Sequence, residues 1–266
     1  MESSPNTAVR PVRPIAPYIG GKRNLARRIV KLIETIDHSA YFEPFVGMGG
    51  IFLRRTSRPK TEAINDISGD VATLFRVLQE HYAYFVDMLR WRLTSRAEFD
   101  RLLSLPGDRL TDLQRAARFL YVQRLAFGGK VAGRHFGVQA QAPARFDITR
   151  LEPMLAEIHE RLSGVVIEQL DYGAFIDRYD HPGALFYLDP PYWGCETDYG
   201  PKVFTRGDFE TLADQLALLK GRFVLSINDT AEIRTIFSKF DLQPVDLTYQ
   251  ISGKPTSARE LIIQPR

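Results

Sequence analysis

The chain carries the stretch Tyr41-Phe42-Glu43-Pro44-Phe45-Val46-Gly47-Met48-Gly49-Gly50, and this stretch decides the fold. Residues 41–46 are mostly apolar and predict a strand, and the glycines that follow predict a tight turn. Residues 51–55 are expected to open a helix. Glycine at such a turn lets the backbone approach a ligand closely, although an ordinary tight turn is the alternative interpretation.

An acidic residue follows at the spacing of a nucleoside-binding site. Asp66 lies 19 residues after Gly47, at the end of a second predicted strand, 62–65. A carboxylate in this place can accept hydrogen bonds from both hydroxyl groups of a ribose. The dinucleotide fingerprint would require a glycine at position 52, where the chain has Phe52, so NAD is disfavoured.

Strand and helix patterns alternate at both ends of the chain and predict an α/β fold with a parallel or mixed sheet. The middle of the chain has few strand signals, so we interpret residues 76–158 as a mainly helical insert, with a glycine-rich loop or hairpin over 127–142. Residues 1–14, rich in Pro, Ser and Arg, are expected to form a flexible arm. Helices are also predicted over 24–36, 208–219 and 231–238, with another over 153–162 at the end of the insert. Strands are predicted over 165–169, 185–188, 223–227 and 261–264.

Composition limits the class of protein. The 266 residues are 44% hydrophobic, which is enough for a large domain with an insert. The single cysteine, Cys195, cannot form an intrachain disulfide, and no apolar run is long enough to span a membrane. We therefore expect a soluble cytoplasmic monomer with no membrane partner. The five histidines have no metal-ligand spacing, so no metal is expected.

Basic residues gather in one part of the insert. Residues 114–150 contain seven basic residues and one acid, a net charge of +6, whereas the remainder of the chain sums to −3. This contrast favours a phosphate-binding surface, and a solvated helix face is the alternative. The basic residues are Arg115, Arg118, Arg124, Lys130, Arg134, Arg145 and Arg150.

The sequence Asp189-Pro190-Pro191-Tyr192 follows the strand predicted over 185–188. The two prolines fix an extended turn and remove two amide donors, so the polar groups that remain near the carboxylate are acceptors. Such a site suits an exocyclic amine of a nucleobase, and Tyr192 can stack on the base. A rigid strand-to-loop turn is the alternative.

A third motif, Tyr18-Ile19-Gly20-Gly21-Lys22, precedes the first predicted helix. Glycines before a helix N-terminus can bind an anion, and Lys22 adds a positive charge. A carboxylate such as that of methionine would fit this element, although a helix-entry loop needs no ligand.

Together these motifs resemble the Dam-type family of DNA adenine methyltransferases. The resemblance covers residues 15–75 and 160–266, and the motifs stand in the family's order. The endings Ser226-Ile227-Asn228-Asp229-Thr230 and Arg259-Glu260-Leu261-Ile262-Ile263 are also similar to those of phage and bacterial members. The resemblance implies a Rossmann-like methyltransferase sheet with helices on both faces, made of residues 15–75 and 159–266, and a target-recognition insert over 76–158.

The resemblance also implies roles for individual residues around S-adenosylmethionine and a flipped adenine. Asp189 would hold cofactor and target amine together, Pro190 and Pro191 would shape this catalytic turn, and Tyr192 would stack on the base. Asp66 would bind the cofactor ribose. The other residues implied at the cofactor are Tyr18, Gly20, Gly21, Lys22, Phe45, Gly47, Gly49, Asp171 and Tyr172.

The basic segment coincides with the family's hairpin for the target strand. Arg124, Lys130 and Arg134 are therefore the candidate DNA-binding residues, with Lys130 expected at a phosphate and Arg124 at a base. The family pattern for reading GATC is not evident here, so the target sequence stays open. Duplex DNA is the expected partner, in a bacterial or phage-infected cell and associated with the nucleoid, and a separate restriction endonuclease is a candidate partner.

Four alternatives remain open at the level of sequence. They are methylation of the cytosine amine, of RNA or of a protein glutamine, and a DNA-binding protein with a decayed active site. Cytosine enzymes more often begin the acceptor motif with serine, and glutamine enzymes mostly use asparagine there. Intact Asp66 and Asp189 argue against decay.

Overall fold

A seven-stranded sheet in the order β5-β4-β2-β6-β7-β9-β8 forms the centre of the computed structural model, which describes residues 6–137, 141, 143–200, 203–251 and 254–266. Strands β5, β4, β2, β6 and β7 run parallel, and β9 and β8 complete the sheet as an antiparallel hairpin. The strands are β2 (Ala40–Glu43), β4 (Thr61–Asn65), β5 (Val166–Glu168), β6 (Ala184–Leu188), β7 (Arg222–Asn228), β8 (Asp241–Ile251) and β9 (Lys254–Gln264).

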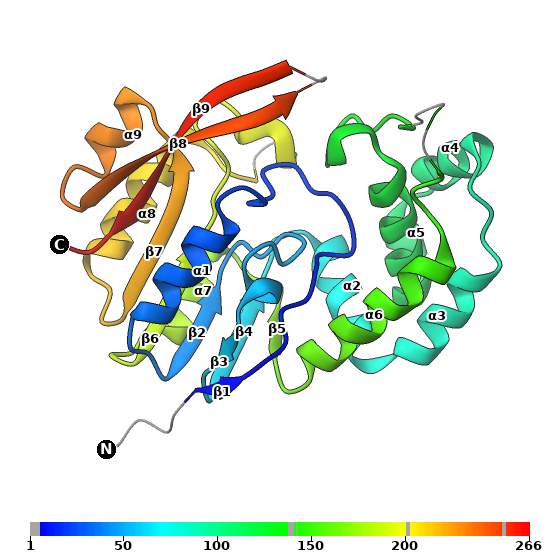
Figure 1. Ribbon diagram of the computed structural model, residues 1–266, viewed down its shortest axis with the longest axis horizontal. Coiled ribbons are helices and arrows are strands. Elements are labelled where there is room, and N and C mark those ends of the chain that lie inside the picture. The colour runs from blue at the N-terminus through cyan, green and yellow to red at the C-terminus, as the bar shows by residue number, and fades with distance from the viewer. Residues whose placement is uncertain (1–5, 138–140, 142, 201–202, 252–253) are drawn as a thin grey trace.

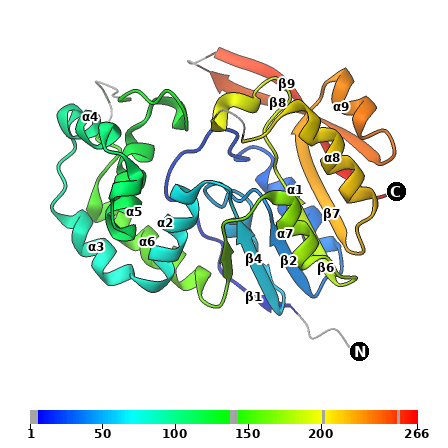
Figure 2. The same ribbon diagram turned by 180° about the vertical axis from the view of Figure 1, so that it is seen from behind.

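Both faces of the sheet are covered by helices, as expected of a Rossmann-like methyltransferase fold. Helix α1 (Ala26–Thr35) lies on one face, and α7 (Tyr172–Tyr179), α8 (Arg206–Ala217) and α9 (Ala231–Ile236) lie on the other (Figures 1 and 2). Successive strand residues point to opposite faces, so Tyr41 and Phe42 belong to two separate buried clusters. The apolar runs that predicted the central strands are therefore buried on both sides.

The helices between β4 and β5 gather beside the sheet rather than on it (Figure 1). They are α2 (Gly69–Glu80), α3 (Tyr82–Arg90), α4 (Arg96–Ser104), α5 (Asp112–Leu125) and α6 (Ile148–Leu162), with the 3-10 turns η2 (Gly107–Arg109) and η3 (Phe127–Gly129). The buried residues of α2, α5 and α6 join the cluster under α1, so the group shares a core with one face of the sheet.

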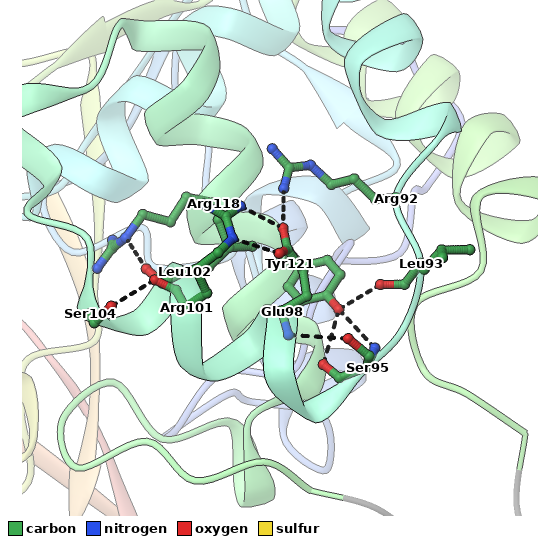
Figure 3. Close-up of polar contacts among 9 residues, drawn as sticks. All are labelled: Arg92, Leu93, Ser95, Glu98, Arg101, Leu102, Ser104, Arg118 and Tyr121. Carbon is green, nitrogen blue, oxygen red and sulfur yellow. Dashed lines mark hydrogen bonds and ion pairs between the residues drawn. The ribbon is translucent and has the colours of Figure 1, made fainter.

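Local hydrogen bonds define where these helices begin. Ser95 caps α4 by accepting a hydrogen bond from the Glu98 amide at 3.1 Å, and the Tyr121 hydroxyl donates to the Leu93 carbonyl at 2.8 Å (Figure 3). Helix α6 begins five residues before the expected start at 153, because Asp147 accepts a hydrogen bond from the Thr149 amide and caps the helix there.

The N-terminal segment, expected to be a flexible arm over 1–14 that is either disordered or loosely docked, is docked in its described part. Strand β1 (Thr7–Ala8) pairs antiparallel with β3 (Ser57–Arg58), and the Val12 amide donates to the Leu53 carbonyl at 2.7 Å. Val12 is buried in the core, so its apolar side chain anchors the N-terminal segment to the domain. The Pro-, Ser- and Arg-rich composition of this segment had suggested flexibility. Residues 1–5 lie outside the described residues.

Three more regions of the chain add detail to the elements expected from the sequence. The turn after Gly50 enters only the one-turn helix η1 (Phe52–Arg54). Strand β8 was not expected, and it lies at the sheet edge where Pro244 is tolerated. In the loop expected over 127–142, Ala126 and Phe136 form an isolated antiparallel bridge, and residues 138–140 and 142 lie outside the described part. Within the described residues, no helix has the length and apolarity to cross a membrane.

Candidate active site

The carboxyl ends of β2, β4 and β6 open onto a cavity of about 1030 Å³. The loops that leave these three strands bring Gly47, Asp66 and Asp189 to its wall, although these residues are far apart in the sequence. Ligands of open α/β sheets bind at this edge of the sheet. Tyr18, Gly20, Gly21 and Lys22 line the same cavity from the segment before α1, so the three sequence motifs share one site.

The turn after β2 needs its glycines. Gly47 and Gly49 have φ of 50° and 71°, which disfavours other residues. A β-carbon at Gly47 would lie 3.1 Å from Cε1 of Tyr18, and one at Gly49 would lie 2.8 Å from Cγ of Leu53. The Tyr18 ring therefore packs directly on the turn, and a side chain at Gly47 would push it out of the cavity.

Asp66 is held by the backbone of this turn. Its Oδ2 atom accepts a hydrogen bond from the Gly47 amide at 2.9 Å, and its Oδ1 atom accepts one from the Ser68 amide at 2.9 Å. Burial raises the pKa of Asp66 to about 6, while the two amide donors act in the opposite direction. Asp66 thus places a fixed carboxylate in the cavity, ready to accept hydroxyl donors.

Aromatic rings form the next part of the wall. The rings of Phe45 and Tyr172 lie 5.4 Å apart, and Phe204 lies 6.1 Å from Phe45 and 5.7 Å from Tyr172. All three line the cavity, as does Asp171, whose side chain caps α7 through the Gly173 amide. Such a group of rings offers a flat heterocycle a surface for stacking.

Asp189 and Lys22 form an ion pair in the wall of the cavity. The Lys22 Nζ atom lies 2.8 Å from Asp189 Oδ1 and 3.6 Å from Glu260 Oε2, and its side chain is buried. Burial raises the pKa of Asp189 to about 6, and the Lys22 ammonium limits the rise. The ion pair keeps a charged carboxylate in an otherwise unfavourable place.

The prolines after Asp189 are buried, and Pro191 lines the cavity. The Lys22 ammonium donates to the Tyr192 hydroxyl and lies 4.2 Å from the centre of its ring, so Tyr192 packs on Lys22. The Asn228 side chain then fixes the loop, accepting from the Trp193 amide at 2.9 Å and donating to the Trp193 carbonyl at 3.0 Å.

Other residues of the site were missed by the sequence reasoning. Glu43 lines the cavity, accepts a hydrogen bond from the Tyr41 hydroxyl at 2.6 Å, and has a pKa raised by burial to about 8. Tyr199 lines it too and donates to the Ile19 carbonyl at 3.1 Å. Glu43 and Glu260 could have been identified from the sequence, because each is an acidic residue beside the apolar residues of a strand.

The candidate DNA-binding residues of the insert lie in different surroundings. Lys130 is exposed, directly after η3. Arg134 is half-buried, with its guanidinium 5.5 Å from the centre of the Phe119 ring. The guanidinium of Arg124 donates to the Ile15 carbonyl at 2.7 Å and the Arg145 carbonyl at 2.9 Å, so it joins the insert to the N-terminal segment.

Several other arginines of the basic segment have structural partners. Arg115 pairs with Asp70 at 2.6 Å, and Arg118 donates to the Leu102 carbonyl at 2.8 Å (Figure 3). Arg145 donates to the Ala126 carbonyl at 3.3 Å, and Arg150 lies 3.5 Å from Asp147. Much of the charge that suggested a phosphate-binding surface is therefore engaged within the protein.

Comparison with known proteins identifies the family of this chain. Residues 18–251 match the family of D12 class N6 adenine-specific DNA methyltransferases. The type II methyltransferase M1.LlaDCHI of Lactococcus lactis subsp. cremoris is 26% identical, over 95% of this chain and 94% of its own. The type II methyltransferase M.CviBI of Paramecium bursaria Chlorella virus NC1A is 21% identical, over 86% of this chain and 88% of its own. The chain belongs to the D12 class of N6 adenine-specific DNA methyltransferases.

Proposed function

We propose that the cavity binds S-adenosylmethionine as the methyl donor. Its size, its fixed carboxylate at Asp66 and its aromatic wall at Phe45 and Tyr172 match the ribose and adenine of this cofactor. Tyr18, Gly20, Gly21, Gly47 and Asp171 line the remainder of the proposed cofactor site, and Gly49 shapes the turn that carries Gly47. When bound, the cofactor supplies an electrophilic methyl group on a sulfonium.

We assign Asp189 as the residue that receives the target amine. Its carboxylate accepts an N–H bond of the adenine N6 group, and the Pro190 carbonyl accepts the second, so the nitrogen lone pair turns toward the methyl group. With S-adenosylmethionine bound, the amine nitrogen would receive the methyl group while sulfur keeps the electron pair of the broken bond, and Asp189 would accept the proton that the amine loses. Positioning and electrostatics carry the rate, since the leaving group is already good.

Lys22 has two proposed tasks at this site. It lies beside the expected cofactor position, and its 2.8 Å ion pair with Asp189 orients the carboxylate that receives the amine. Tyr192, which packs on Lys22, is the proposed stacking surface for the adenine. An adenine within a duplex cannot reach these groups, so we propose that the base flips out of the helix, at a cost of a few kcal/mol.

The division of the chain follows from the same proposal. Residues 15–75 and 159–266 carry the catalytic sheet, and residues 76–158 recognise the target sequence in duplex DNA. Exposed Lys130, beside the cavity-lining residue Val131, is the proposed phosphate contact of this insert. Arg134 and Arg124 are proposed to act nearer the bases.

One observation carries the proposal: Asp189, Lys22 and Asp66 line one cavity although three separate motifs supply them. The test is transfer of tritium from labelled S-adenosylmethionine to duplex DNA, RNA and protein, followed by nucleoside analysis for N6-methyladenine. Asp189→Ala should lower transfer by at least about 100-fold, the scale of one lost electrostatic contact to the reacting group. DNA affinity should stay near that of wild type, because phosphate contacts lie elsewhere.

The isosteric variant Asp189→Asn controls for packing, since it retains the shape of the side chain and removes its charge. Near-normal transfer by both variants would remove Asp189 from the mechanism. Methylation found on cytosine or RNA, with Asp189 still required, would instead correct the substrate and leave the catalytic assignment in place.

A further inference from the structure

A group of arginines lines one side of the active-site cavity and has no role in the proposal above. Arg13 comes from the N-terminal segment, Arg23 and Arg27 from the chain at the start of α1, and Arg54 from η1. We call these four residues the α1 arginine cluster. They lie on the same cavity as Asp189 although none belongs to the basic segment of the insert.

The cluster brings like charges together. The pKa of Arg54 is lowered, first by burial and then by the positive charges of Arg23 and Arg13, so the three guanidinium groups are near one another. Arg54 is half-buried and donates to the Gly50 carbonyl at 2.5 Å. Arg13, Arg23 and Arg27 are exposed.

The three exposed arginines of the cluster have no acidic partner among the described residues to neutralise their charge. Among the described side chains, Arg13, Arg23 and Arg27 form no ion pair with an acid. In contrast, Arg10 pairs with Glu157 at 3.1 Å. The positive charge on this side of the cavity is therefore directed at solvent and at whatever enters the cavity.

Three arginines of the insert have partners within the protein. Arg115 is paired with Asp70, and Arg118 and Arg124 are bound to backbone carbonyl groups. A set of like charges without counter-ions raises the energy of the protein alone and is relieved by an external polyanion. Because DNA is the substrate of this family, its phosphates are the anions that reach the cavity together with the adenine.

We propose that Arg13, Arg23 and Arg27 bind backbone phosphates of the target strand next to the flipped adenine. The guanidinium group binds phosphate oxygens through two parallel N–H bonds, and an exposed side chain can follow the strand as the base leaves the helix. In this arrangement the insert holds the DNA on one side of the cavity and the α1 arginine cluster holds it on the other. The inference rests on the proposed site and adds a DNA-binding surface to it.

The test is a salt titration of DNA affinity for the double variant Arg23→Ala/Arg27→Ala. It uses a duplex that wild type methylates and a duplex of scrambled sequence. Two lost phosphate contacts should flatten the log–log salt slope by about 1.8, at about 0.9 for each contact. The advantage of wild type over the variant should then fall about 12-fold between 50 and 200 mM salt. The loss should be equal on both duplexes, because phosphates carry no sequence.

Arg28→Ala is the matched control, because Arg28 is exposed beside Arg27 but does not belong to the cavity wall. It should keep the wild-type slope. An unchanged slope and affinity in the double variant would overturn the proposal, as would a loss confined to one sequence. Weaker S-adenosylmethionine binding with an unchanged DNA slope would assign the cluster to the cofactor carboxylate instead. Absence of adenine methylation by wild type would fail the proposed function separately.

Discussion

The Nζ atom of Lys22 lies 2.8 Å from Oδ1 of Asp189, and this ion pair joins the segment before α1 to the loop after β6. The Lys22 side chain is buried, and its positive charge lowers the pKa of Asp189 against the effect of burial. Glu260 of β9, with Oε2 3.6 Å from the same ammonium, adds a second negative charge and opposes ionisation of Asp189. The charge state of the Asp189 carboxylate, the proposed acceptor of the target amine, therefore depends on residues from distant parts of the chain.

Removal of Lys22 should shift the pH dependence of methyl transfer. Asp189 accepts the amine only when ionised, so the acid limb of kcat/KM for wild type should fall near its pKa of about 6. In Lys22→Met, burial and Glu260 act without opposition and raise this pKa further. We expect the acid limb to move upward by more than about one pH unit.

The exposed residue Lys31 of α1 supplies the control for this experiment. Lys31→Met should keep the wild-type pH profile. If Lys22→Met lowers the rate equally at all pH values, the ion pair does not govern the ionisation of Asp189.

Asp66→Ala should weaken S-adenosylmethionine binding by roughly 1.5–3 kcal/mol, about 10- to 150-fold in Kd, through the loss of charge-assisted hydrogen bonds. Titration calorimetry measures this change directly. Asp66→Asn retains one acceptor oxygen and should lose less. Unchanged cofactor affinity in Asp66→Ala would contradict the assignment of Asp66 to the ribose.

Arg124→Ala and Lys130→Ala should differ in kind. Without the Arg124 guanidinium, the Ile15 and Arg145 carbonyls lose their donor, so we expect a loss of stability of about 1–3 kcal/mol in denaturant unfolding. Lys130→Ala should leave stability unchanged and flatten the salt slope of DNA binding by about one unit.

The two measurements also test the sequence-based roles of these residues. Relaxed discrimination at one base pair in Arg124→Ala, on a protein that remains folded, would support base reading by Arg124. If Lys130→Ala keeps both the affinity and the salt slope of wild type, Lys130 is a solvated lysine.

Removing the carboxylate of the buried ionic cluster around Glu62 of β4 should have a large effect on stability. The Glu62 carboxylate lies 2.6 Å from Arg55 Nη1 and accepts two hydrogen bonds from Arg161, at 2.7 and 2.8 Å. Glu62→Ala leaves two buried guanidinium groups without their carboxylate and should lower the free energy of unfolding by about 3–5 kcal/mol. The surface pair Lys239–Asp214 is the control, and Lys239→Ala should cost only a small part of this.

The sequence predicted those parts of the fold whose signals are local. The strands β2, β6 and β7 contain apolar runs, and the capping pair Thr205 and Asp208 marked the start of α8, where the Thr205 amide donates to Asp208 at 2.7 Å. Strand β8 was not predicted because Pro244 interrupts its alternation of polar and apolar residues. A strand at the edge of a sheet tolerates such a proline.

Contacts between residues that are far apart in the sequence could not be predicted from local sequence patterns. The excess of arginine in residues 114–150 was visible, but its meaning depends on Asp70 and on backbone carbonyls that only the folded chain brings near. Glu260 likewise acquires its place beside Lys22 only when β9 pairs with β7. Among the alternatives left open by the sequence, family membership selects the adenine amine of DNA.

The segment before α1 has a consequence for attempts to change target specificity by exchanging the insert. The Ile19 amide donates to the Gly129 carbonyl at 3.0 Å, Gln123 donates to the Pro17 carbonyl at 2.9 Å, and Arg124 donates to the Ile15 carbonyl. The proposed recognition insert is therefore hydrogen-bonded to the segment that supplies Tyr18 and Lys22, and the two cannot be exchanged independently. A chimera that imports residues 76–158 from a relative has to keep side-chain donors for the Ile15 and Pro17 carbonyls, as Arg124 and Gln123 are here.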